Sequence, residues 1–235
     1  MFQRIAGVLF APAESFEEIA RKPDIVAPML VIVAISFLTV AAIVPRFDME
    51  SLISNQRETI QKQNPNMTEA DFERIGRMTS AFAKVMFWLS PLFNLIVYVV
   101  FASVLLFAFR LMAGEGTFAQ AVSATLYAFI PLVLFSIILA IVVLVQGSFD
   151  PVTAPTIVKS NPAFLVDFKE QPVLFSLLSS LDLFTIWTVV LLIFGFAALS
   201  KLPRARSAAI VIFLWFVFIL VRVGFAAMGA ARMKG

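Results

Sequence analysis

Five long apolar stretches leave this chain little choice of fold. They cover residues 25–44, 85–109, about 127–145, 173–199 and 208–228. A helix of about 20 residues rises about 30 Å, which is the thickness of the hydrocarbon core of a bilayer. A membrane barrel would instead show alternating strands of about ten residues. The sequence therefore predicts an all-α polytopic membrane protein with five transmembrane helices.

Composition agrees with this prediction and excludes several functions. Hydrophobic residues make up 61% of the chain and charged residues 14%, and the net charge of +3 is too small for a nucleic-acid surface. The chain has no cysteine and no histidine, so thiolate or imidazole metal sites, cysteine nucleophiles and Ser-His-Asp triads are excluded. We expect no enzyme activity, no cofactor and no nucleic-acid partner.

Residues 1–24 are predicted to lie at the membrane interface, ahead of a membrane domain over residues 25–235. An amphipathic helix is expected there, with Phe2, Ile5 and Leu9 on its apolar face. The sequence "SFEE" resembles a capping box that starts a second short helix at Ser15. A signal peptide is the rival interpretation, but the apolar run is short and no cleavage site is obvious.

The one long polar loop, residues 45–84, is predicted to be helical. Two helices are expected, over residues 49–62 and 69–84, and Thr68 and Asp71 are in position to cap the second. That helix is expected to continue into the second span. A charge-balanced loop of this kind is either a soluble hairpin or a surface that docks a partner.

Basic residues near the ends of the spans predict the orientation. Arg21, Lys22, Arg110 and the cationic loop at residues 201–206 belong to one side, which the positive-inside rule assigns to the cytoplasm. The N-terminus is then cytoplasmic and the C-terminus outside. The six basic residues of the 45–84 loop, together with Arg232 and Lys234, are the contrary signal.

Asp182 and Arg222 interrupt the fourth and fifth spans at nearly the same depth. They lie 21 residues before and 19 residues after Pro203, at the turn of an antiparallel hairpin. An ion pair would remove two isolated charges from lipid, where each costs about 2.5 to 3.5 kcal/mol. The alternatives are that each side chain reaches the headgroups alone, or that both belong to a transport path.

Prolines in two spans predict kinks. Pro91 and Pro131 each remove a helical hydrogen bond and free a carbonyl. Asn94 and Ser103 are the side chains that we expect to satisfy such a carbonyl.

Two motifs resemble the Yip family of five-span membrane proteins, in its bacterial branch. They are "LFAPAESFEEIARKPDIVAP" and "GEGTFAQAVSATLYAFIP". The matching residues are Pro12, Phe16, Ile19 and Pro28 in the first, and Gly114, Gly116, Phe118, Tyr127 and Pro131 in the second. The resemblance implies a bacterial cytoplasmic (inner) membrane. It also implies a scaffold, since eukaryotic members bind Rab GTPases and one another, although this chain lacks their Asp-Leu-Tyr-Gly-Pro sequence.

Two functions follow from these patterns. The first is a non-enzymatic integral membrane scaffold that binds other membrane proteins or itself as a homo-oligomer, within the lipid bilayer. The second is a transporter or channel subunit with a polar path near Asp182 and Arg222. No substrate is indicated.

Overall fold

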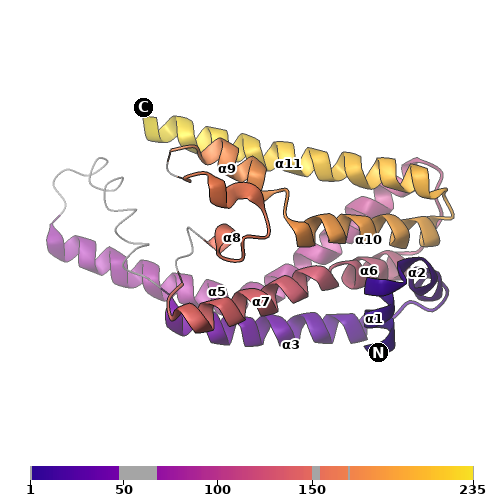
Figure 1. Cartoon of the computed structure of the whole chain (residues 1–235), viewed down its shortest axis with the longest axis horizontal. Helices are drawn as coiled ribbons and strands as arrows, with labels where there is room; N and C mark the ends of the chain where they lie inside the picture. The colour runs from indigo at the N-terminus through magenta and orange to yellow at the C-terminus, as the bar shows by residue number, and fades with distance from the viewer. Residues whose placement is uncertain (1, 48–67, 150–153, 169, 235) are drawn as a thin grey trace.

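The computed structural model describes residues 2–47, 68–149, 154–168 and 170–234. Within these ranges the regular structure is helical, apart from an isolated bridge between Phe47 and Phe149. Five helices are long and apolar enough to cross a membrane (Figure 1). The prediction of an all-α membrane protein with five spans is therefore confirmed.

The five spans follow one another along the chain, and the connections at residues 112–117 and 201–203 are short. The spans comprise α3 (Val26–Ile43) with η1 (Val44–Arg46), α5 (Glu69–Leu111), α6 (Phe118–Ala128) with α7 (Ile130–Gln146), α10 (Leu183–Ser200) and α11 (Arg204–Lys234).

The helix α5 begins in the polar loop and continues through the membrane, as predicted. Thr68 accepts a hydrogen bond from the Asp71 amide, and the Asp71 side chain accepts one from the Thr68 amide, which completes the expected capping box. At 43 residues, α5 is about 65 Å long, twice the thickness of the bilayer core. The other predicted loop helix, 49–62, lies outside the described residues.

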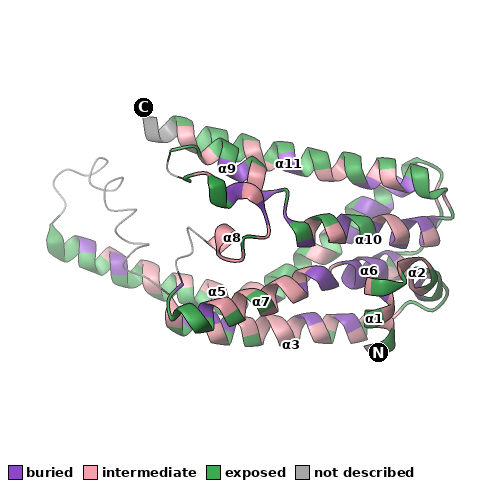
Figure 2. Ribbon diagram, viewed as in Figure 1, coloured by how far each residue is buried: buried purple, intermediate pink, exposed green. Residues whose placement is uncertain are grey.

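The third span is two helices, and the first of them is the centre of the bundle. Pro131 lies in the first turn of α7, where its missing amide hydrogen costs nothing, so the break falls at Phe129. Every residue from Ala121 to Ala128 is buried (Figure 2). Hydropathy alone places "GTFAQAVSA", residues 116–124, as an interfacial approach to this span, and that expectation is wrong, because α6 packs against α5, α10 and α2.

Two short helices, α1 (Phe2–Phe10) and α2 (Pro12–Arg21), fold over one end of the bundle. Phe16 and Ile19 are buried there, and the Phe16 ring lies directly against Gly195 of α10. The capping box predicted at Ser15 is wrong. The helix α2 begins three residues earlier at Pro12, whose fixed φ suits the first helical turn.

The fourth span is also divided. The helix α9 (Pro172–Ser179) ends before Asp182, and α10 begins after it. The prediction of one continuous span over residues 173–199 is corrected here, because the Asp182 side chain bonds to backbone amides and so starts a new helix. Two short elements, α8 (Ala154–Ile157) and η2 (Pro162–Leu165), precede α9, which packs against α11.

Hydrogen bonds between residues far apart in sequence show which helix ends lie at the same end of the bundle. The Gln120 side chain donates to the Ala20 carbonyl, and the Glu115 amide donates to the Ser200 carbonyl. At the opposite end, the Phe149 amide donates to the Arg46 carbonyl. The residues near 20, 115 and 201 therefore share one end, as the charge pattern predicts.

The contact between Phe16 and Gly195 predicts a sharp size limit. A Cβ at Gly195 would lie 3.1 Å from the Phe16 ring and 3.3 Å from the Cβ of Ala124, so Gly195→Leu overpacks the site. We expect a loss of about 1 to 3 kcal/mol in unfolding free energy in detergent. Gly224→Leu is the control, because a Cβ there meets nothing within 4 Å. Equal effects of the two changes would contradict this packing.

Candidate functional site

The candidate site lies at the junction of α9 and α10, where Asp182 is buried. Its Oδ1 accepts hydrogen bonds from the amides of Phe184, at 2.9 Å, and Thr185, at 3.2 Å. Its Oδ2 accepts a hydrogen bond from the Ser160 hydroxyl. The carboxylate is thus held at the positive end of the helix dipole, which is the favourable end for an anion.

Arg222 reaches the same junction from α11. One of its terminal nitrogens donates to Ser179 Oγ at 2.9 Å and the other to Ser180 Oγ at 3.3 Å. Both hydroxyls in turn donate to the Ser176 carbonyl, which is the last-turn acceptor that α9 leaves open. The guanidinium therefore ties α11 to the end of α9.

The structure brings Asp182 and Arg222 to one junction without a direct ion pair between these two described side chains. Each charge is bound to serine and backbone groups instead. The serines of the stretch "SLLSS" are adjacent in sequence and could be noticed there, whereas Ser160 lies 22 residues from Asp182 and gives no local signal. The polar groups of this junction therefore hold α9, α10 and α11 together.

The motif residues gather mainly at the opposite end. Gly116 has a φ of +121°, and a Cβ on it would lie 2.5 Å from a methyl group of Leu199, so both conformation and space require glycine. Gly114 is also closely packed, because a Cβ there would lie 2.9 Å from the Phe109 carbonyl oxygen and 3.1 Å from the Cβ of Ser200. Next to this turn, Glu115 forms an ion pair with Lys201 at 2.6 Å.

The turn leads into α6, and Thr117 and Gln120 form a capping box at its start. Tyr127 is fully buried and donates a hydrogen bond to Asp24 at 3.4 Å. Pro12 and Pro131 begin α2 and α7. Phe118 is the exception, since 52% of its surface is exposed.

Sequence reasoning did not find two polar contacts at this end. The Ser123 hydroxyl accepts a hydrogen bond from the Asp24 amide and donates one to the Asp24 carbonyl. Arg4 bonds to Glu18 at 2.6 Å, and this hydrogen bond raises the pKa of the guanidinium. Asp24 and Ser123 are distant in sequence, and Arg4 and Glu18 lie on separate helices. A local sequence pattern therefore does not predict either contact.

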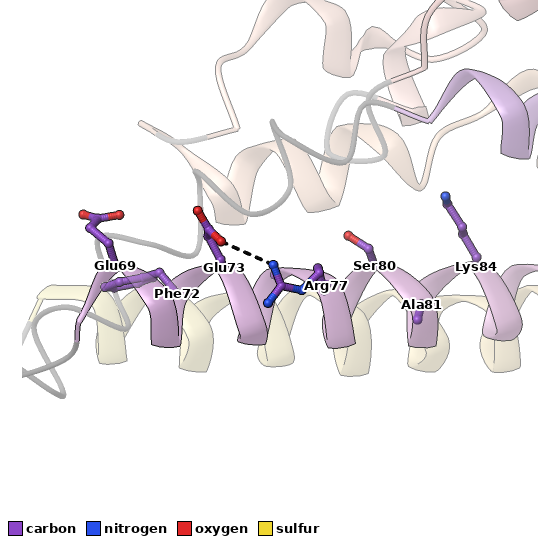
Figure 3. Close-up of a pocket in the computed structure, with 8 residues that line it drawn as sticks. Glu69, Phe72, Glu73, Arg77, Ser80, Ala81 and Lys84 are labelled. Atoms are coloured by element: carbon purple, nitrogen blue, oxygen red, sulfur yellow. Dashed lines mark hydrogen bonds and ion pairs between the residues drawn. The ribbon is translucent and has the colours of Figure 1, made fainter.

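A hollow of about 570 Å³ lies on the first turns of α5 (Figure 3). Its described lining comes from one face of that helix and includes Glu69, Glu73, Arg77 and Lys84. Glu73 and Arg77 form an ion pair at 3.3 Å. In the described part of the chain no cluster of acidic residues is suited to a metal ion.

The cap predicts different effects for two substitutions of Asp182. Asn caps a helix about as well as Asp, so Asp182→Asn should cost under about 1 kcal/mol in unfolding free energy. Asp182→Ala removes the cap and leaves the Ser160 hydroxyl without its acceptor, so it should cost about 2 to 3 kcal/mol. Thermal unfolding in detergent and in lipid measures both.

A double-mutant cycle tests the partners of Arg222. Arg222→Met and Ser179→Ala should couple by more than about 0.5 kcal/mol, because the two side chains are in contact. Arg222→Met and Asp182→Asn should be additive within about 0.5 kcal/mol. Strong coupling between Arg222→Met and Asp182→Asn would indicate that the two side chains form a direct ion pair, which would contradict the contacts described here.

Comparison with known proteins identifies the family. No curated protein and no solved structure matches the chain. The family model of the Yip1 domain matches residues 6–225, which includes four spans, most of the fifth and both motifs. This match covers nearly the whole chain, so the chain belongs to the Yip1 domain family of membrane proteins.

Proposed function

We propose that this protein is a non-enzymatic membrane scaffold that binds other membrane proteins or itself. The observation that carries the proposal is the extension of α5. Its first 16 residues, 69–84, precede the apolar stretch and project past the bundle (Figure 1). Phe72 and Gly76 on this extension are buried, whereas most of its other side chains are exposed and form a surface available to a partner.

The extension has the mixed character of a docking surface. Glu73 and Arg77 are exposed, and the large apolar side chains of Met78 and Phe82 have 64% and 65% of their surface exposed. Aromatic residues and methionine are enriched in protein interfaces, and charges at their rim set specificity. The family match supports the same role, since it places the chain among membrane proteins.

The intramembrane charges support a structural role as well. Asp182 is engaged by a helix N-terminus and Ser160, and Arg222 is engaged by two serines. A titrating or ion-binding group must exchange its partners during a transport cycle. The side chains of Asp182 and Arg222 are instead engaged by hydrogen bonds that join the helices to one another.

The alternative is a transporter or channel subunit with a polar path near Asp182 and Arg222. It is favoured by the buried hydroxyls of Thr125 and Thr188, which make no hydrogen bond to any described residue. Flux in proteoliposomes that disappears in Asp182→Asn, a variant that keeps the cap, would favour this alternative.

We further propose the bacterial cytoplasmic (inner) membrane, with the N-terminus in the cytoplasm and the C-terminus outside. The support is the clustering of basic residues at the end that carries α1, α2 and the 201–206 loop. The chain has no native cysteine, so single introduced cysteines report topology directly.

Two exposed positions test this orientation, Arg74 on the extension and Pro203 in the cationic loop. In intact cells a membrane-impermeant maleimide should label Arg74→Cys, whereas Pro203→Cys should react only after permeabilisation. The reverse result would invert the orientation. Labelling of both from one side would contradict the alternation of five spans.

A charge swap on the extension tests partner binding. Glu73→Lys combined with Arg77→Glu keeps the i,i+4 pair and the helix but reverses the surface pattern. We expect the proteins that co-purify in gentle detergent to fall at least fivefold, with unfolding temperature unchanged. The matched control is Glu17→Lys with Arg21→Glu, which swaps an i,i+4 pair on α2. Equal losses in both variants, or no loss in either, would overturn the assigned surface.

A further inference from the structure

Asn94 is an exposed amide within the membrane-spanning part of α5. It lies ten residues after Lys84 and sixteen before Arg110, so the nearest charged residues on its helix are about 15 Å and 24 Å away along the axis. Its side chain makes no hydrogen bond to any residue that the structure describes. An amide left so in hydrocarbon costs several kcal/mol.

The sequence predicts that Asn94 donates a hydrogen bond to a carbonyl freed by a proline, but another residue makes this bond. Pro91 frees the Phe87 carbonyl, and the Ser90 hydroxyl donates to that carbonyl at 2.7 Å. Ser103 likewise bonds to its own helix, at the Val99 carbonyl. The kink in the backbone ladder is therefore satisfied without Asn94, whose polar group stays directed outward.

The residues around Asn94 repeat at the spacing of a helix-pairing seam. Positions 87, 94, 101 and 108 alternate with positions 83, 90, 97 and 104, which is the a and d pattern of a heptad. Asn94, Val97 and Val104 are exposed and the other five are half-buried, with Phe87 against Phe47 and Phe101 against Phe129 of the same chain. The second set is small or β-branched, namely Ala83, Ser90, Val97 and Val104. Small residues let membrane helices approach closely.

We propose that this seam of α5 is a homodimer interface, with Asn94 of one copy paired to Asn94 of a second copy. A two-fold axis along the membrane normal places the same residue of both copies at the same depth. A primary amide carries both a donor and an acceptor, so two of them form a reciprocal pair across such an axis. A second copy thus supplies the missing partner at the required depth.

This inference deepens the proposed scaffold and rests on it, because it names one partner and the surface that binds it. It places self-association inside the membrane on α5, whereas the extension at residues 69–84, apart from Ala83 at its end, remains available to other proteins. The two surfaces belong to one helix, so a dimer would present two extensions side by side.

Cysteine crosslinking in native membranes tests the seam. Val97→Cys should form a disulfide-linked dimer on mild oxidation, since position 97 lies on the seam and is 58% exposed. Leu92→Cys is the matched control. It is 48% exposed and close in depth to Asn94, but two residues on a helix turn about 200°, to the opposite face. Equal crosslinking at both positions, or none at 97, would overturn the proposal.

Substitution of Asn94 tests the amide itself. Asn94→Leu should weaken dimerisation in vesicles, measured by energy transfer between labelled copies, about three- to thirtyfold, whereas Asn94→Gln should retain most of it. The unfolding temperature of the monomer should not fall, because leucine suits lipid. If Asn94→Leu dimerises like the wild type, the assignment fails. If wild type stays monomeric yet still retains its co-purifying proteins, this inference fails and the scaffold stands.

Discussion

The constraint on which this structure depends is that a backbone polar group within lipid must find its partner inside the protein. Within a helix the backbone amides and carbonyls pair with one another, which satisfies this constraint along most of the chain. Where a helix is interrupted, side chains and other backbone groups supply the partners. At Pro91 the freed carbonyl accepts from Ser90. At the start of α10 the free amides donate to Asp182, and the Leu183 amide donates to the Ser160 carbonyl. The charge of Asp182 is thus part of the backbone arrangement.

The bundle has two unlike ends. At one, α1, α2, the turn at residues 113–117 and the start of α11 pack together, with ion pairs at Arg4–Glu18 and Glu115–Lys201. At the other, α5 extends past the spans and α8, η2 and α9 form a short-helix region. The matched residues of both family motifs lie mostly at the packed end. This distribution fits a rigid base from which a recognition element projects.

Hydropathy and local capping rules predicted the five spans and the Thr68 cap. Both depend on residues close in sequence, such as Thr68 with Asp71. The break at Asp182 was missed because an aspartate in an apolar stretch looks the same whether it pairs across helices or caps one. Ser160 and Arg222, which complete that junction, come from elsewhere in the chain. The burial of α6 likewise arises from tertiary packing, which overrides its position at the start of a span.

The contact of Phe16 with Gly195 has a consequence for biogenesis. The first helices leave the ribosome before any span, yet the surface that receives Phe16 belongs to α10, which is made after about four fifths of the chain. Until then α1 and α2 can pack only on each other and on α6 and α7, and the apolar side chains that face α10 lie nearest to the membrane surface. The amphipathic N-terminal helices can then stay at the membrane surface during synthesis. Their docking onto α10 is a late step of assembly.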